Sequence, residues 1–271
     1  MSISRNAGFT IIETMLFLGI SGLLVVALLV GTGASINTQR YRDSVSTFMA
    51  FLQQQYSDVN NVSNDRSGDW SCGSDGAQTK QGGSSVVPRG QSDCFIAGRF
   101  IMVDKDGGIT TLPVTGLQTG TAEGSDVSML TDNYAFDLST VGEEKSSLEW
   151  GAKLSWPVAD AGPSTKPAGT PRAIWILIIR SPDSGSVYTF TYDPSTDTDT
   201  PIENITSDFI KNQIMKPSGS QSRRTICIDS ASGVAPGSKL AVFISDNASN
   251  ASAIETRSYQ TILSMGGGPK C

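Results

Sequence analysis

Glu13 is the residue of this sequence whose surroundings point most directly to a chemical role. It is the only charged residue between Phe9 and Val30, in a run that is otherwise uncharged and mostly apolar. As a helix, this run is roughly 33 Å long, which is enough to cross the hydrocarbon core of a bilayer. A carboxylate at the entrance of such a helix is costly unless a cation pairs with it, so we expect Glu13 to have a functional partner.

The charges that flank this run predict its orientation. Arg5 precedes it, and the next basic residue is Arg40. The positive-inside rule therefore places the N-terminus in the cytoplasm and the chain after Val30 outside. A secretory signal peptide that is cleaved near Thr32 or Ala34 is the alternative, but such peptides do not normally carry a glutamate at the start of their apolar region.

The start of the sequence resembles the class III leader of type IV pilins and type II secretion pseudopilins. The resemblance is carried by Gly8, Phe9 and Glu13, followed by the apolar run. The resemblance implies cleavage between Gly8 and Phe9 by a prepilin peptidase, and N-methylation of Phe9. It also implies that Glu13 pairs with the N-terminal ammonium of a neighbouring subunit when a filament assembles. The partners that it implies are other pilin subunits, the peptidase and an inner-membrane assembly platform. The proline that the family carries near the end of the apolar run is absent, and Val30 and Gly31 occupy that region.

A single helix is predicted to run from about Phe9 to about Asn60. Beyond the apolar run, large apolar residues recur every three or four positions, which is typical of one face of a helix. They are Tyr41, Val45, Phe48, Leu52, Tyr56 and Val59. After a leader of residues 1–8, we therefore expect residues 9–31 to cross the membrane and residues 32–60 to pack on a folded domain.

Residues 61–271 are predicted to form an extracellular β-rich domain, because they are rich in Gly, Ser, Thr and Asp and lack long helical patterns. The fold class that follows is α+β and pilin-like, with one long N-terminal helix packed on antiparallel strands. The expected strand pairs are Phe95–Val103 with Ile109–Val114, Ala173–Arg180 with Val187–Tyr192, and Thr225–Ile228 with Leu240–Ile244, with one more strand at Ile254–Leu263.

Two other stretches of this domain give weaker patterns. Residues 63–92 are polar and Gly-rich, and they are expected to form a long loop that a disulfide closes. Residues 119–171 give the least clear pattern of secondary structure in the chain. We interpret them as an inserted subdomain with Trp150 and Trp156 in its core.

The cysteines predict disulfides. There are four, Cys72, Cys94, Cys227 and Cys271, and all lie in the part that is placed outside the membrane, where disulfides persist. Three pairings are possible. We favour Cys72–Cys94, which closes a loop, together with Cys227–Cys271, which ties the C-terminus to a strand. Zinc is the alternative, but no CxxC spacing is present.

The ionisable residues disfavour catalysis and raise one binding hypothesis. The chain has no histidine, and nothing assembles a nucleophile, a base and an orienting group, so we expect no enzyme activity, cofactor or metal site. Residues 121–204 hold 13 acidic and 5 basic residues, whereas residues 205–271 hold 7 basic and 4 acidic residues. The basic surplus of the second segment indicates either a DNA-binding patch or, more simply, a solvated surface. The residues of the possible patch are Arg223, Arg224, Lys239 and Arg257.

Two acidic segments have part of the composition of a calcium loop. Asp104–Gly107 and Asp193–Asp199 each offer carboxylates at close spacing, but neither has the full ligand set of an EF-hand. We interpret the first as a hairpin turn and the second as a solvated loop.

The function expected from the leader, the helix and the size of the chain is that of a minor pilin subunit, since a major pilin is usually smaller. Such a subunit is a single-pass membrane protein before assembly and part of an extracellular filament afterwards. Its roles are adhesion, twitching motility or DNA uptake, with a host-cell surface or DNA as an outer partner. A type II secretion pseudopilin is the alternative within the family, and a signal-anchored surface binding protein is the alternative outside it.

Overall fold

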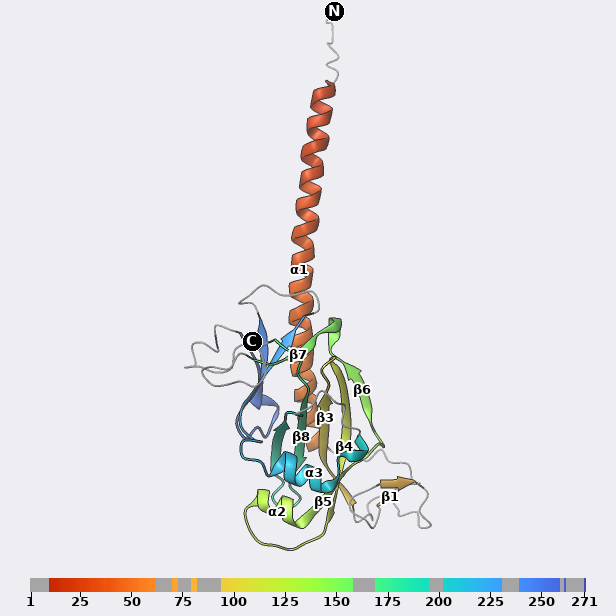
Figure 1. Cartoon of the computed structure of the whole chain (residues 1–271), viewed down its shortest axis with the longest axis vertical. Coiled ribbons are helices and arrows are strands. Elements are labelled where there is room, and N and C mark those ends of the chain that lie inside the picture. The colour runs from red at the N-terminus through yellow and green to blue at the C-terminus, as the bar shows by residue number, and fades with distance from the viewer. Residues whose placement is uncertain are drawn as a thin grey trace, which may run out of the picture. The chain divides into compact units, whose positions relative to one another are not determined.

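The protein is described here by a computed structural model that covers residues 10–61, 70–72, 79–81, 94–157, 169–194, 202–230, 239–258, 261 and 271. The chain forms two compact units, Met1–Arg40 and Tyr41–Cys271. The long helix α1, Ile11–Asn60, begins in the first unit and continues into the second (Figure 1). Its 50 residues confirm the single long helix that the sequence predicts.

The larger sheet of the second unit has six strands in an antiparallel arrangement. The order is β5-β4-β3-β8-β9, and β6 pairs with β4 beside β5. The bounds are Cys94–Val103 for β3, Gly108–Gln118 for β4, Tyr134–Leu138 for β5, Glu144–Ser147 for β6, Ile174–Arg180 for β8 and Val187–Tyr192 for β9. The β3–β4 and β8–β9 hairpins are both confirmed.

Both faces of this sheet are buried at its centre. In β8, Ile174, Ile176 and Ile178 point to one face, and Trp175, Leu177 and Ile179 point to the other, all buried. This explains the continuous apolar run of β8, because a strand that is covered on both faces has no solvent side for polar residues. The adjoining strand β3 approaches β8 so closely at Gly98 that a Cβ atom there would lie 2.0 Å from the Ile178 carbonyl oxygen.

A second sheet of four strands has the antiparallel order β12-β11-β10-β7. Its strands are β7 Lys153–Ser155, β10 Arg224–Asp229, β11 Leu240–Ile244 and β12 Ile254–Ser258. The predicted pairing of β10 with β11 is confirmed, and β12 ends at Ser258. A separate two-stranded sheet, β1 Trp70–Cys72 with β2 Thr79–Gln81, lies in the stretch that we expected to be a loop.

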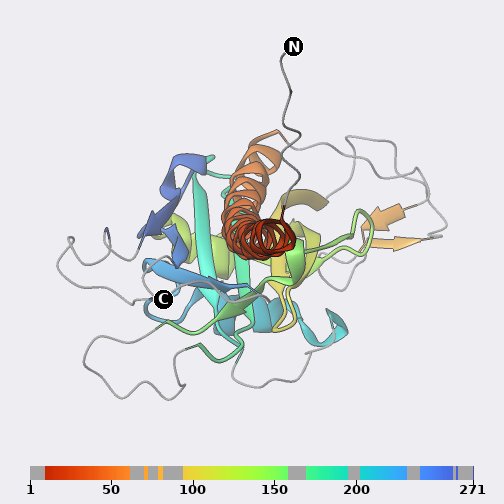
Figure 2. The same cartoon turned by 90° about the horizontal axis from the view of Figure 1, so that it is seen from above.

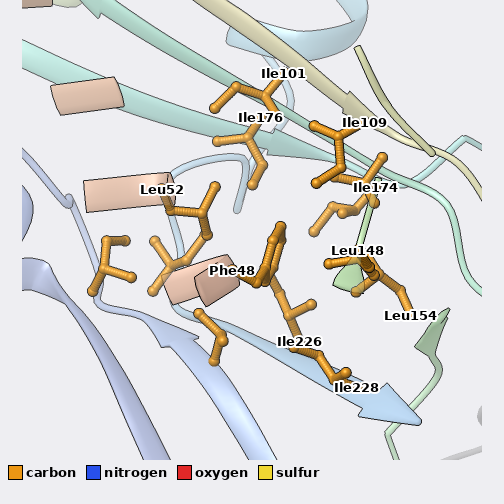
Figure 3. Close-up of a cluster of buried hydrophobic side chains, with 14 of the residues drawn as sticks. Phe48, Leu52, Ile101, Ile109, Leu148, Leu154, Ile174, Ile176, Ile226 and Ile228 are labelled. Carbon is orange, nitrogen blue, oxygen red and sulfur yellow. The ribbon is translucent and has the colours of Figure 1, made fainter. Parts of the chain in front are cut away.

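The second half of α1 contributes to a core that includes residues of both sheets (Figure 2). All members of the predicted apolar stripe are buried here, with at most 2% of their surface exposed: Tyr41, Val45, Phe48, Leu52, Tyr56 and Val59. Figure 3 shows Phe48 and Leu52 among isoleucines of the six-stranded sheet, such as Ile101 and Ile176, and of the four-stranded sheet, such as Ile226. Burying a side chain such as Phe48 or Leu52 stabilises the fold by about 1.5–3 kcal/mol.

The other face of the six-stranded sheet carries a second core, and helical segments cover it. These are α2 (Asp126–Asn133), α3 (Ser207–Phe209) and a π-helical turn η3 (Ile210–Met215). Leu130 of α2 and Ile210 and Ile214 of η3 are fully buried against Phe100 and Phe136 of the sheet. Short 3-10 turns occupy Glu149–Gly151 (η1), Ile202–Asn204 (η2) and Ala251–Ala253 (η4).

Residues 119–171 do not form the inserted subdomain that we expected, as far as the structure describes them. Strands β5 and β6 extend the six-stranded sheet, β7 joins the four-stranded sheet, and α2 covers the second core. Trp150 is 55% exposed, so it is not a core residue. Trp156 is partly buried beneath the guanidinium of Arg172, whose central carbon lies 4.5 Å from the indole centroid.

Candidate functional site

Glu13 caps the start of α1. Its Oε2 accepts hydrogen bonds from the Thr10 backbone N–H at 3.0 Å and from the Thr10 hydroxyl at 3.1 Å. In return, the Glu13 backbone N–H donates to the Thr10 hydroxyl at 3.3 Å. This reciprocal pattern is a capping box, in which two N–H groups at the end of a helix find side-chain acceptors. Glu13 therefore has a local role beside the intersubunit role that the sequence resemblance implies, while Gly8 and Phe9 lie outside the described residues.

The helix that follows Glu13 exposes its apolar side chains. Ile11, Leu23 and Val30 are 75%, 73% and 69% exposed. Within the described residues this is one helix long and apolar enough to cross a membrane, with a window of mean hydropathy 2.4. A signal sequence near the N-terminus passes the same test of length and hydropathy, so this property alone does not separate a retained anchor from a cleaved one.

In the second unit, polar side chains fix the position of α1 at both ends of its buried segment. The Tyr41 hydroxyl accepts a hydrogen bond from the Leu240 backbone N–H at 2.6 Å and donates to the Leu240 carbonyl at 3.1 Å, which joins α1 to β11. The Tyr56 hydroxyl lies 2.8 Å from the Thr189 hydroxyl, which joins α1 to β9. Burial raises the pKa of both tyrosines to about 12, so both hydroxyls stay neutral and available for these bonds.

The Cys227–Cys271 disulfide is confirmed. The two Cα atoms are 5.4 Å apart, and the bond ties the last residue of the chain to the middle of β10. Cys94, at the start of β3, is also disulfide-bonded. The side chain of Cys72, its predicted partner, lies outside the described part of the chain, so the Cys72–Cys94 pairing stays a prediction.

The structure does not gather the four basic residues of the DNA hypothesis on one face. The strand register places Arg224 on the α1 side of the four-stranded sheet, level with Ile244 and Ile254. Arg257 points to the opposite side, because it is three residues further along β12 than Ile254 and side chains alternate along a strand. The guanidinium of Arg257 lies over the ring of Phe243, 3.4 Å from its centroid.

Three of these four residues also have acidic partners. Arg224 lies 3.6 Å from Asp193, Lys239 lies 2.5 Å from Asp229, and Arg257 pairs with Glu255. Arg223 is exposed, and its backbone N–H donates to Asp246 at 2.7 Å. DNA binding remains an untested prediction, but this arrangement removes the common basic face on which it depended.

The acidic segments are used for structure where they are described. Oδ1 of Asp104 accepts the backbone N–H groups of Asp106 and Gly108, each at 2.8 Å, as a hairpin turn requires. Asp193 pairs with Arg172 at 2.6 Å, and residues 195–199 of the second segment lie outside the described residues. Among the residues that the structure describes, no cluster of three or more metal-ligand side chains occurs.

Sequence reasoning missed two polar clusters. Arg172 is 3% exposed and donates both to Asp193, which follows β9, and to the Thr225 carbonyl of β10 at 3.0 Å, so it joins the two sheets. Burial lowers the pKa of Arg172, and the adjacent Asp193 carboxylate opposes that shift. No local pattern marks Arg172, since its partners lie far along the chain.

The second missed cluster surrounds Asp126 at the start of α2. Its carboxylate accepts hydroxyl hydrogen bonds from Ser181 at 2.7 Å, Ser184 at 2.5 Å and Tyr188 at 2.7 Å. These residues belong to the β8–β9 hairpin and to the turn between its strands, so the cluster joins α2 to that hairpin. The three hydrogen bonds satisfy the Asp126 carboxylate and attach α2 to the hairpin.

Comparison with known proteins gave no match to a family model, a curated protein or a solved structure.

Proposed function

We propose that this chain is a prepilin, and that its mature form is a minor subunit of an extracellular type IV filament. The observation that carries the proposal is the division of α1. Its first part exposes an apolar surface that has Glu13 at its entrance, and its second part is the central helix of a folded β-rich domain. A chain that must be stored in a bilayer and then assembled through that same helix needs both parts.

The role proposed for Glu13 has two stages. In the single subunit, the capping box with Thr10 satisfies the carboxylate. After cleavage at Gly8, the new N-terminus is a cation at about the same depth as the carboxylate of a neighbouring subunit. Pairing of the two lowers the cost of keeping a charge in an apolar surrounding, and so favours subunits in lateral contact over dispersed ones.

The proposed partners follow from these stages. A prepilin peptidase removes residues 1–8 on the cytoplasmic side, and an inner-membrane platform extracts the subunit for assembly with other pilins. Adhesion to a host-cell surface, motility or DNA uptake would then involve the unit Tyr41–Cys271. A type II secretion pseudopilin shares the leader and the divided helix, and loss of protein secretion in a strain that lacks this chain would favour that alternative.

The two stages can be separated by two substitutions at one position. Glutamine can replace glutamate in a capping box, but it carries no charge. If pairing with an ammonium drives assembly, Glu13→Gln will lower incorporation into sheared filaments about as strongly as Glu13→Leu. If Glu13 serves only as a cap, Glu13→Gln will assemble normally and Glu13→Leu will not. The measurement is the ratio of filament-bound to membrane-bound protein in a strain without the wild-type chain.

A further inference from the structure

A pocket opens between two loops of the unit Tyr41–Cys271. One loop, residues 216–223, joins η3 to β10, and the other, residues 245–250, joins β11 to η4. The pocket has a volume of about 330 Å³, at the lower end of the range for small-molecule sites. Its lining is mostly polar and includes Gln221, Asp246 and Asn247, while Met215 and Pro217 add apolar surface.

Hydrogen bonds fix the two loops to each other. The Asn247 N–H donates to the Gln221 carbonyl at 2.9 Å, and the Asp246 carboxylate accepts the Arg223 N–H at 2.7 Å. Ala248, which follows Asn247, is 3% exposed and belongs to the core around α1. The pocket is therefore formed before any ligand arrives, which lowers the entropic cost of binding.

Three side chains of the lining keep unused capacity for hydrogen bonds. Within the part of the chain that the structure describes, the carboxamides of Gln221 and Asn247 make no hydrogen bond, and Oδ2 of Asp246 accepts none. All three residues are at least partly exposed, so water occupies these positions until a ligand replaces it. A carboxamide both donates and accepts, whereas a carboxylate only accepts.

The lining disfavours two classes of ligand and suits a third. It contains no Arg or Lys side chain among its described residues that could pair with a phosphate or a carboxylate. A calcium ion takes about six to eight oxygen ligands, and Asp246 is the single carboxylate of this lining. A neutral ligand with several hydroxyl groups fits better, because each hydroxyl donates and accepts, as a carboxamide does. The C–H groups of such a ligand can lie on Met215 and Pro217.

We propose that this pocket binds one neutral sugar unit at the end of a glycan, through Gln221, Asp246 and Asn247. The pocket is widely open to solvent, which suits a terminal unit whose remaining chain extends outward. The glycan can belong to another cell's surface or to the envelope of the producing cell. The inference goes beyond the proposed filament, because the pocket would serve a signal-anchored binding protein equally well. In a filament, it gives the adhesion role a class of ligand.

The first measurement screens the detergent-solubilised full chain against two sets of probes. One set is an array of oligosaccharides that end in neutral sugars, together with sialylated and sulfated forms of the same chains. The other set is neutral polysaccharide extracted from the envelope of the producing cell. We expect neutral probes of one set to bind, and that set identifies the source. If no neutral probe binds, or if sialylated or sulfated forms alone bind, the inference is wrong.

Substitutions then place the binding in the pocket. Asn247 has a φ of 49°, in the left-handed region, so Asn247→Gly removes the carboxamide and keeps the backbone conformation. Asp246→Asn removes one acceptor and the charge, but keeps an oxygen for the Arg223 N–H. Titration calorimetry with the best probe should show binding about 10-fold weaker in each variant, the factor expected for one lost hydrogen bond to the ligand.

The matched control is Asn250→Gly, which removes another exposed carboxamide at the end of the same loop, outside the pocket lining. Glycine is an acceptable N-cap for η4, so this variant should bind the probe as wild type does. Unchanged binding in both pocket variants would overturn the inference. So would a loss of binding that accompanies a large fall in melting temperature in both, because the side chains would then be structural. Neither result depends on cleavage at Gly8 or on a filament, so the proposed function fails or stands separately.

Discussion

At the scale of single residues, the second half of α1 is located by hydrogen bonds as well as by apolar packing. An apolar stripe alone permits a helix to slide or rotate between two sheets, because dispersion and burial are not directional. Tyr41 binds both backbone groups of Leu240, and Tyr56 binds Thr189 on the other sheet. Each bond fixes one point of the helix, and together they define its register.

Tyr41→Phe tests this role. The substitution keeps the ring but leaves the N–H and the carbonyl of Leu240 without their partner, so we expect a loss of about 1–3 kcal/mol in unfolding free energy. Tyr56→Phe removes one bond, to Thr189, and should cost about 1 kcal/mol. Urea unfolding of the detergent-solubilised chain gives both values. A cost at Tyr41 that is no larger than the cost at Tyr56 would show that the paired bonds to Leu240 do not locate the helix.

At the scale of elements, α2 is attached to the β8–β9 hairpin through one carboxylate. Burial of Asp126 pushes its pKa up, but the hydroxyls of Ser184, Ser181 and Tyr188 together lower it below its ordinary value. The folded state therefore binds a proton at Asp126 less readily than the unfolded state does. This contribution to stability is fully present above the unfolded pKa of about 3.9 and is lost as the pH falls through the lower folded value.

Asp126→Asn should therefore be less stable than wild type at neutral pH. The difference in stability between the two proteins, called the gap below, should narrow as the solution is acidified below about pH 4. Melting temperatures of the two proteins across an acid series measure the gap. Asp208→Asn, which removes an exposed carboxylate of α3, is the matched control. A gap that stays constant down to the lowest pH would mean that the carboxylate charge of Asp126 does not hold α2.

The elements that sequence alone predicts are those with a local signal. The stripe from Tyr41 to Val59 repeats at the helical period, and the two hairpins have turn residues between apolar runs, so each could be identified without a partner. The capping box was also readable, since Thr10 and Glu13 have its spacing. It was missed because Glu13 was interpreted only as a membrane carboxylate.

Other elements depend on distant contacts and could not be predicted. Strand β6 is exposed along its whole length, and its four residues give no alternating pattern; it is a strand because β4 pairs with it. The burial of Arg172 depends on Asp193 and Thr225, which are remote in sequence. The common basic face that the DNA hypothesis required could not be judged from the sequence for the same reason. Charge counts along a chain do not say which face of a sheet each residue occupies.

At the scale of the whole molecule, the unit Tyr41–Cys271 is closed by contacts between remote parts of the chain. Arg172 joins the two sheets, the turn at Glu149–Gly151 links them beside α1, and the Cys227–Cys271 disulfide ties down the C-terminus. These contacts bring parts of the chain that are remote in sequence into one folded unit, and the disulfide among them persists in an oxidising environment.

Removing the Cys227–Cys271 bond should destabilise this unit. It closes a segment with a sequence separation of 44, for which the chain-entropy model gives about 4 kcal/mol. Cys271→Ser should therefore lower the urea midpoint, and adding a reductant to wild type should move its midpoint in the same direction. If Cys271→Ser unfolds at the wild-type midpoint under oxidising conditions, the bond does not stabilise the folded unit.

The central claim is that residues 1–8 are a leader and that the mature chain begins at Phe9. Intact-mass and N-terminal peptide mass spectrometry of the protein from its native membrane tests this most directly. We predict a chain that starts at methylated Phe9, and a Gly8→Val variant that keeps residues 1–8 because the bulkier side chain blocks the peptidase. A mature chain that begins near Ala34, or one that still begins at Met1 and is indifferent to Gly8→Val, would contradict the account.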